Sequence, residues 1–139
     1  MIETKDSRVV LERTFHHPVD KVWRALTESS LIAEWMMPND FIPEVGKTFT
    51  LRAEPMPQWD GIVRGEVLEI VPQKRVRYAW TSPASIEITI DITPINDRVH
   101  LKVQLSGAEK PAVGGAKYGW EQQFLPALER TLDEQETAS

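Results

Sequence analysis

The sequence predicts an α+β domain in which a strongly curved antiparallel sheet wraps around one long C-terminal helix. Apolar residues recur at every second position in short segments from residue 8 to residue 105, a pattern typical of half-buried strands. Short turns separate these segments, so consecutive strands are expected to be antiparallel neighbours. The last apolar stripe is helical, and it alone is long enough to cover one face of the sheet.

The first strand is expected at residues 8–15, and two short helices are expected to follow it. Val9, Leu11 and Phe15 share one face of this strand, which Arg13 interrupts. Pro18 suits the first position of the first helix, because its missing N–H needs no partner there. The apolar stripes of the two helices are Val19, Val22, Trp23 and Leu26, then Leu31, Ile32, Trp35 and Met36. Ser29-Ser30 offers an N-cap to the second helix, and Pro38 stops it.

Five more strands are predicted after Pro43, at residues 48–53, 62–71, 75–81, 86–93 and 99–105. Gly65 lies inside the second of these, and an interior glycine often marks a bulge or a sharp bend. The last two strands alternate cleanly between apolar and polar residues, which predicts one buried and one wet face. Together with the first strand, they give the order β-α-α-β-β-β-β-β-α for the whole chain.

The C-terminal helix is expected from about residue 116 to about residue 134, after a loop that contains Pro111, Gly114 and Gly115. Its apolar residues recur at every fourth position: Trp120, Phe124, Leu128 and Leu132. At about 1.5 Å per residue such a helix is about 30 Å long and crosses the sheet. Pro126 lies inside the helix and leaves the carbonyl of Gln122 without its helical donor, which predicts a kink.

Length and composition exclude several classes of protein. The 139 residues suit one domain, 1–139, with its core at about 8–134. The absence of cysteine excludes disulfides, thiolate zinc sites and thiol nucleophiles, and fits a reducing compartment. A net charge of −5 argues against binding to nucleic acid. The N-terminus has no signal-peptide pattern, and no segment approaches the roughly 18 apolar residues of a membrane span. We therefore expect a cytoplasmic protein without a membrane span.

Catalytic and metal-binding motifs are not found in the sequence. It contains no Gly-rich phosphate loop, no G-x-S-x-G and no H-E-x-x-H. Adjacent His16 and His17 point apart and lack a carboxylate cluster that would complete a metal site. Glu66, Asp91 and His100 are the candidates for a general base, and two of them alternate to the polar face of their strands. No catalytic residue, metal or cofactor is therefore predicted.

Charged residues near the strands have two interpretations. Glu12 and Arg13 are neighbours on the first strand, and Arg64, Glu66 and Arg77 could meet across adjacent strands. A buried charge could orient the polar head of a ligand. Cross-strand ion pairs on the wet face are the simpler interpretation.

Aromatic residues are the strongest functional signal, because five tryptophans are many for this length. Six residues are predicted to line an apolar ligand cavity: Trp35, Met36, Tyr78, Trp80, Trp120 and Phe124. A solid core is the alternative for the same residues. Met56 and Trp59, in a proline-rich loop, could form an entrance lip or a partner contact, or could fold onto the core.

Six short motifs follow one another in order along the chain: Arg13-Thr14-Phe15; Pro18 with Val22-Trp23-Arg24-Ala25-Leu26-Thr27; Glu34-Trp35-Met36-Met37-Pro38; Val45-Gly46; Gly65-Glu66-Val67-Leu68-Glu69-Ile70-Val71-Pro72; and Gly119-Trp120. From about residue 8 to residue 132 the chain thus resembles the heat-shock protein 90 ATPase activator homologue family of the START-like (SRPBCC) superfamily. The resemblance implies a helix-grip fold with an apolar cavity between sheet and helix. Met36 stands where family members usually have tryptophan, and Pro126 is unusual.

Three hypotheses about function follow. The first is binding of a small hydrophobic or amphipathic molecule, which could be a lipid, a sterol or an aromatic compound. The second, which rests on the resemblance, is a chaperone co-factor in a stress response, with the chaperone as partner. The third is an enzyme of the polyketide cyclase or aromatase type, which would need an ionisable group inside the cavity.

Overall fold

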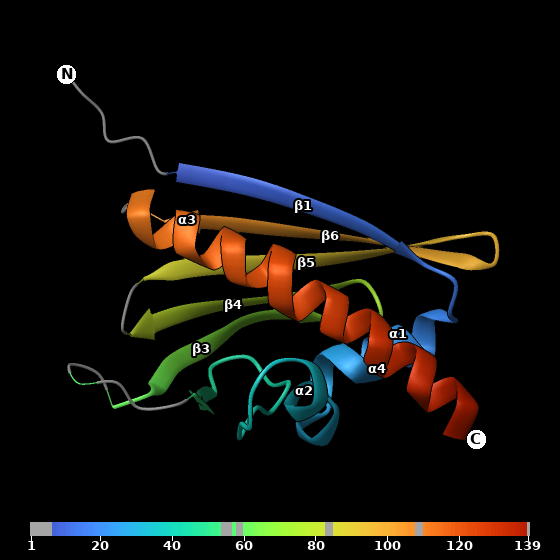
Figure 1. Ribbon diagram of the computed structural model, residues 1–139, viewed down its shortest axis with the longest axis horizontal. Helices are drawn as coiled ribbons and strands as arrows, with labels where there is room; N and C mark the ends of the chain where they lie inside the picture. The colour runs from blue at the N-terminus through green and yellow to red at the C-terminus, as the bar shows by residue number, and fades with distance from the viewer. Residues whose placement is uncertain (1–6, 54–56, 58–59, 83–84, 108–109, 139) are drawn as a thin grey trace.

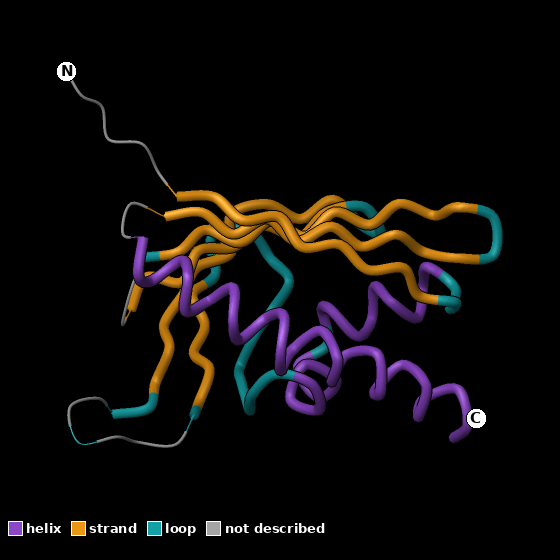
Figure 2. Tube along the Cα trace, turned by 45° about the horizontal axis from the view of Figure 1, so that its top comes forward, coloured by secondary structure: helices purple, strands orange, loops and turns teal. Residues whose placement is uncertain are grey.

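The computed structural model describes residues 7–53, 57, 60–82, 85–107 and 110–138. A six-stranded antiparallel sheet, in the order β1-β6-β5-β4-β3-β2, forms one layer (Figure 1). The helices form a second layer on one face of this sheet, which curves toward them (Figure 2). The predicted α+β helix-grip fold, with two short helices after the first strand, is confirmed. Met56 and Trp59 lie outside the described residues.

The predicted strands are all present, with bounds close to those expected. They are β1 (Ser7–Phe15), β2 (Thr48–Arg52), β3 (Ile62–Val71), β4 (Arg75–Ser82), β5 (Ile86–Ile95) and β6 (Arg98–Gly107). The first and last strands are neighbours, because β1 pairs with β6 along its whole length. Gly65 lies at a shift in the register between β3 and β4, as its interior position predicted.

The two short helices, α1 (Val19–Thr27) and α2 (Ser29–Trp35), are joined by a single residue. Glu28 ends α1 by donating its N–H to the carbonyl of Arg24, and its own carbonyl accepts from the N–H of Ile32 at the start of α2. The predicted cap is therefore wrong by one residue: Glu28 occupies it, and Ser29 instead donates its hydroxyl to the carbonyl of Asn39. Pro18 precedes α1 as its N-cap instead of taking its first position.

The C-terminal helix is longer than predicted. It comprises α3 (Lys110–Gly119), a π-helical turn η1 (Trp120–Phe124) and α4 (Leu125–Ala138). The expected loop around Pro111 and Gly114-Gly115 is helical. Pro111 is in the first turn, where proline is tolerated, and Val113 in the same segment is buried against the sheet layer. Packing of this kind outweighs the helix cost of about 1 kcal/mol per glycine.

A π turn directly precedes Pro126. The N–H of Leu125 donates to the carbonyl of Trp120, five residues back, in place of the usual four. Proline thus falls at the second position of α4, directly after the turn. A π turn is one of the recognised ways in which a helix adapts to such a residue.

The core lies between the sheet and the helices. Its centre consists of Ile88 and Ile90 of β5, Leu101 and Leu105 of β6, and Leu125, Leu128 and Leu132 of α4, all of which are at most 1% exposed. His17, before α1, is also buried, and its Nε2 lies 2.9 Å from Oδ1 of Asp133 on α4. No group of three potential metal ligands occurs among the residues that the structure describes. In the same residues no helix is long and apolar enough to cross a membrane.

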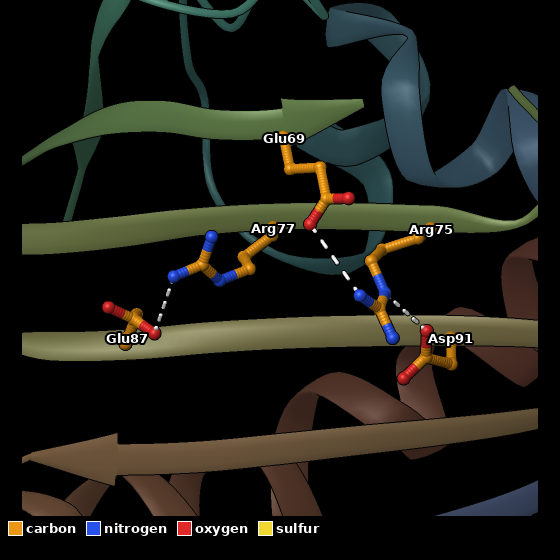
Figure 3. A network of polar contacts seen from close by, with 5 residues as sticks. All are labelled: Glu69, Arg75, Arg77, Glu87 and Asp91. Carbon is orange, nitrogen blue, oxygen red and sulfur yellow. Dashed lines mark hydrogen bonds and ion pairs between the residues drawn. The ribbon is translucent and has the colours of Figure 1, made fainter. Parts of the chain in front are cut away.

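The outer face of the sheet carries the charged residues. Arg75 lies 2.7 Å from Asp91 and 3.6 Å from Glu69, and Arg77 lies 3.1 Å from Glu87 (Figure 3). These contacts are the cross-strand ion pairs of a wet face.

The sequence suggested two sets of neighbouring charged residues, one on β3 and β4 and one on β1. The grouping of Arg64, Glu66 and Arg77 does not form, because Arg77 pairs with Glu87 on β5 and Arg64 pairs with Asp60. On β1, Glu12 bonds His100 at 2.8 Å, and Arg13 donates to the backbone carbonyl of Glu12.

Candidate functional site

The six residues predicted to line a cavity come from three parts of the fold. Trp35 and Met36 end α2, Tyr78 and Trp80 lie on β4, and Trp120 and Phe124 lie in η1: Trp35, Tyr78 and Trp120 are buried, whereas Met36, Trp80 and Phe124 are partly exposed. Partly exposed apolar residues therefore adjoin fully buried ones in each part. Such a boundary occurs both at the edge of a solid core and at the rim of an apolar site.

Three of these residues form what we call the helix-side cluster: Trp35, Trp120 and Phe124. The ring centroids are 5.7 Å apart for Trp35 and Trp120, and 5.4 Å for Trp120 and Phe124, with edge-to-face geometry. The π turn sets the positions of Trp120 and Phe124 on the helix. Trp35 is fixed independently, because its indole N–H donates to the carbonyl of Ala25 in α1 at 2.8 Å.

Tyr78 belongs to a different group, which we call the sheet-side cluster: Phe41, Phe49 and Tyr78. Its three centroid distances are 5.3, 5.5 and 5.8 Å, again with edge-to-face geometry. Phe41 and Phe49 were not among the residues predicted to line the site. The alternation of apolar residues within 48–53 indicates only that Phe49 faces inward. Phe41 follows Asn39, whose side chain accepts the N–H of Phe41, and an Asn turn was the one signal for its position.

Gly65 makes room for the sheet-side cluster. It is paired with Trp80 across the β3–β4 ladder. A Cβ at this position would lie 2.6 Å from Cζ of Phe49 and 2.6 Å from the carbonyl oxygen of Ala79. The ring of Phe49 therefore lies where a side chain at position 65 would be.

The polar groups of this region are few and neutral. The indole nitrogens of Trp80 and Trp120 are buried, and neither donates to any described residue. Burial alone raises the pKa of the Tyr78 phenol far above its ordinary value, so this group stays protonated at physiological pH. These side chains can donate hydrogen bonds and offer apolar surface, and none of them is a base near neutral pH.

The three candidate general bases lie away from this region. Glu66 is exposed on β3, Asp91 binds Arg75 on the outer face, and His100 binds Glu12. All three alternate with buried residues of their strands and so point away from the helices. The interior aromatic region therefore receives no proton-transfer group from this set.

Two surface grooves flank the Gly65–Trp80 pair. One, of about 320 Å³, is lined by residues of β1, β4, β5 and β6 that include Trp80 and the charged Arg8 and Glu87. The other, of about 330 Å³, is lined by residues that include Gly65 and the charged Asp40 and Arg64. Volumes near 300 Å³ are at the lower end of those of small-molecule sites.

Comparison with known proteins identifies relatives. A family model described as "Activator of Hsp90 ATPase homolog 1-like protein" matches residues 16–133. None of the curated proteins compared with the chain matches it. The solved structure of protein MLL2253 from Mesorhizobium loti is 40% identical, with a TM-score of 0.82, over 92% of this chain and 98% of that one.

Two more distant structures share the fold alone. CalU16 from Micromonospora echinospora is 18% identical, with a TM-score of 0.77, over 94% of this chain and 79% of its own. DynU16, from the dynemicin biosynthetic locus, is 23% identical, with a TM-score of 0.78, over 91% of this chain and 47% of its own.

Proposed function

Because this chain belongs to the family of Activator of Hsp90 ATPase homolog 1-like proteins, we propose that it binds a small hydrophobic or amphipathic molecule between its sheet and its C-terminal helix. The fold places a curved sheet against a helix that runs across it (Figures 1 and 2). The site residues are those predicted from the sequence, together with Phe41 and Phe49. A lipid, a sterol or an aromatic compound would meet mainly apolar side chains there.

The observation that carries this proposal is the pair of aromatic clusters beside partly exposed apolar residues. Met36, Trp80 and Phe124 are packed against the core but remain partly open to solvent. Aromatic rings and thioethers adapt to flat apolar ligands, and a small number of polar groups then sets the orientation.

The other two hypotheses have less support. A chaperone co-factor is favoured by the family description and by two exposed apolar residues, Ile42 and Val45, in the segment between α2 and β2. Failure of the protein to bind or stimulate the heat-shock protein 90 of its own host would remove this candidate. A cyclase would need a proton-transfer group at the aromatic clusters, and the three candidate bases point elsewhere.

Amide NMR spectra of the labelled protein, recorded with a panel of lipids, sterols and flavonoid-like aromatics, would test the proposal. We expect shifts at residues 35–37, 78–80 and 120–124 with at least one class of compound. The variant Phe124→Ala should weaken this binding, whereas Ile95→Ala, a change at an exposed residue of the β5–β6 hairpin, should not. Spectra unchanged by every compound would refute the proposal.

A further inference from the structure

The two edge strands of the sheet, β2 and β1, differ in how their backbones are covered. At the β2 edge, the N–H of Arg52 donates to the carbonyl of Pro38 at 2.9 Å. The carbonyl of Thr50 accepts from the N–H of Asp40 at 3.3 Å. The segment before β2 therefore bonds backbone groups that this edge would otherwise present to another strand.

The β1 edge has no such cover in the part of the chain that the structure describes. β6 pairs with β1 along one side over all nine residues of Ser7–Phe15, and no described element lies along the other side (Figure 1). Among the described residues, one further bond reaches the β1 backbone: the guanidinium of Arg13 donates to the carbonyl of Glu12 in an exposed contact. An open strand edge is a template for pairing with a strand of another chain.

The outer face of β1 carries an apolar residue between two opposite charges. Arg8, Val10 and Glu12 are exposed, whereas Leu11 between the last two is buried. Val10 is 44% exposed, which makes it one of the few large apolar side chains on the surface among the described residues. Edge strands that avoid pairing usually place charges or proline at such positions. The centre of the β1 edge is instead apolar.

This pattern is complementary to itself when two β1 strands run antiparallel. If a twofold axis passes beside Val10, this residue lies opposite Val10 of the second copy. Arg8 of each copy then lies opposite Glu12 of the other, and both are on the outer face. Apolar pairs and pairs of opposite charge directly across two strands stabilise a sheet. An axis at Leu11 would instead place Val10 opposite Glu12, so the charges favour the axis at Val10.

We propose that the protein forms a twofold-symmetric dimer in which the β1 strands of two copies pair antiparallel about Val10 and join the two six-stranded sheets into one. Glu12 already bonds His100 at 2.8 Å. A carboxylate has a second oxygen, which is available to Arg8 of the other copy. The interface lies at the sheet edge and involves none of the residues of the two aromatic clusters, so this inference is independent of the proposed function.

Two charge reversals test the proposed register. Sedimentation and light scattering of the wild type, from micromolar to millimolar concentration, should show the mass rise from one chain to two. Arg8→Glu and Glu12→Arg should each weaken the dimer about tenfold or more, because two favourable pairs become two repulsive ones. An equal mixture of the two variants should form a heterodimer, because every pair across that interface again joins opposite charges.

Matched controls separate the interface from other effects. His100→Gln removes the bond to Glu12 without changing a charge at the edge, and it should leave the dimer intact. Val10→Lys should abolish the dimer, whereas Ile95→Lys, at an apolar residue of similar exposure, should not. Far-UV circular dichroism would confirm that each variant is folded. A wild type that stays monomeric, a dimer that survives both charge reversals, or a dimer that the mixture does not restore would overturn the inference.

Discussion

Gly65 on β3 lies directly opposite Trp80 on β4, where the register between the two strands shifts. The missing side chain at Gly65 leaves space that the ring of Phe49 fills. Phe49 in turn contacts Phe41 and Tyr78 in the sheet-side cluster. The bulge, the cluster and the position of the unpaired indole therefore depend on the same glycine.

The variant Gly65→Ala should lower the free energy of unfolding by about 1–3 kcal/mol, the usual cost of overpacking. The added Cβ would lie 2.6 Å from a backbone carbonyl oxygen, that of Ala79, which cannot move without displacing β4. Urea denaturation would measure the loss, and near-UV circular dichroism would report a rearranged sheet-side cluster. A neutral effect would mean that Phe49 and β4 can move apart freely.

Gly114→Ala is expected to have the opposite effect, a gain in the free energy of unfolding. Gly114 lies inside α3, and a Cβ there would meet no atom within 4 Å. Alanine is favoured over glycine in a helix by about 0.5–1 kcal/mol. The variant should therefore be more stable by that amount in the same urea titration. A loss of stability would contradict the finding that this face of α3 is open.

The fold could be predicted because its signals are local. Alternation of apolar residues placed the strands, and the interior position of Gly65 predicted the irregularity in β3. The predicted start of the last helix, at about residue 116, was wrong, because Pro111, Gly114 and Gly115 are typical of a loop. Their helical state depends on tertiary contacts such as the burial of Val113, which no local pattern reveals.

The site could be predicted only in part. Inward aromatic residues follow from strand and helix periodicity, which gave Tyr78, Trp80, Trp120 and Phe124. Which rings touch depends on how distant segments meet, so the separation into two clusters was not foreseen. Phe41 lies in an irregular segment that reaches Tyr78 only through tertiary packing. The unpaired indole N–H of Trp80 depends on strand register, which a single sequence does not specify.

Tyr78 should make stability fall at alkaline pH. Because burial raises its pKa in the folded state, the folded protein binds this proton more tightly than the unfolded chain does. The contribution is fully present below about pH 10, the unfolded value, and is lost as pH rises above it. The wild type should therefore lose stability above pH 10 more steeply than Tyr78→Phe does.

Absorbance at 295 nm, which reports ionisation of tyrosine, tests directly whether the Tyr78 phenol loses its proton in the folded protein. The chain has two tyrosines, so Tyr118→Phe leaves Tyr78 as the sole phenol. We expect its ionisation to coincide with unfolding, as followed by far-UV circular dichroism. Ionisation of Tyr78 near pH 10 in a fully folded protein would show that the sheet-side cluster admits water.

Asp91→Asn should have little effect on stability or binding. Asp91 bonds Arg75 on the outer face, where their side chains are 25% and 42% exposed, and such pairs contribute about 0–1 kcal/mol. Thermal unfolding at low and high salt should show a small difference that salt reduces. Binding of the lipids, sterols and flavonoid-like aromatics should be unchanged. A large loss of binding would contradict this expectation and would mean that Asp91 contributes to the ligand site.

Pro126→Ala should stabilise the protein by no more than about 1 kcal/mol, well below the roughly 3 kcal/mol that proline costs in a regular helix interior. The reason is that the π turn ends directly before Pro126, so the proline lies at the second position of α4 and not in a regular helix interior. Alanine would add an N–H that favours a regular α-helix, and rotation of Trp120 and Phe124 would follow. Urea denaturation would measure the stability, and NMR signals of the Trp120 indole would report the rotation. A gain of 3 kcal/mol with unmoved signals would mean that the π turn does not compensate for the proline.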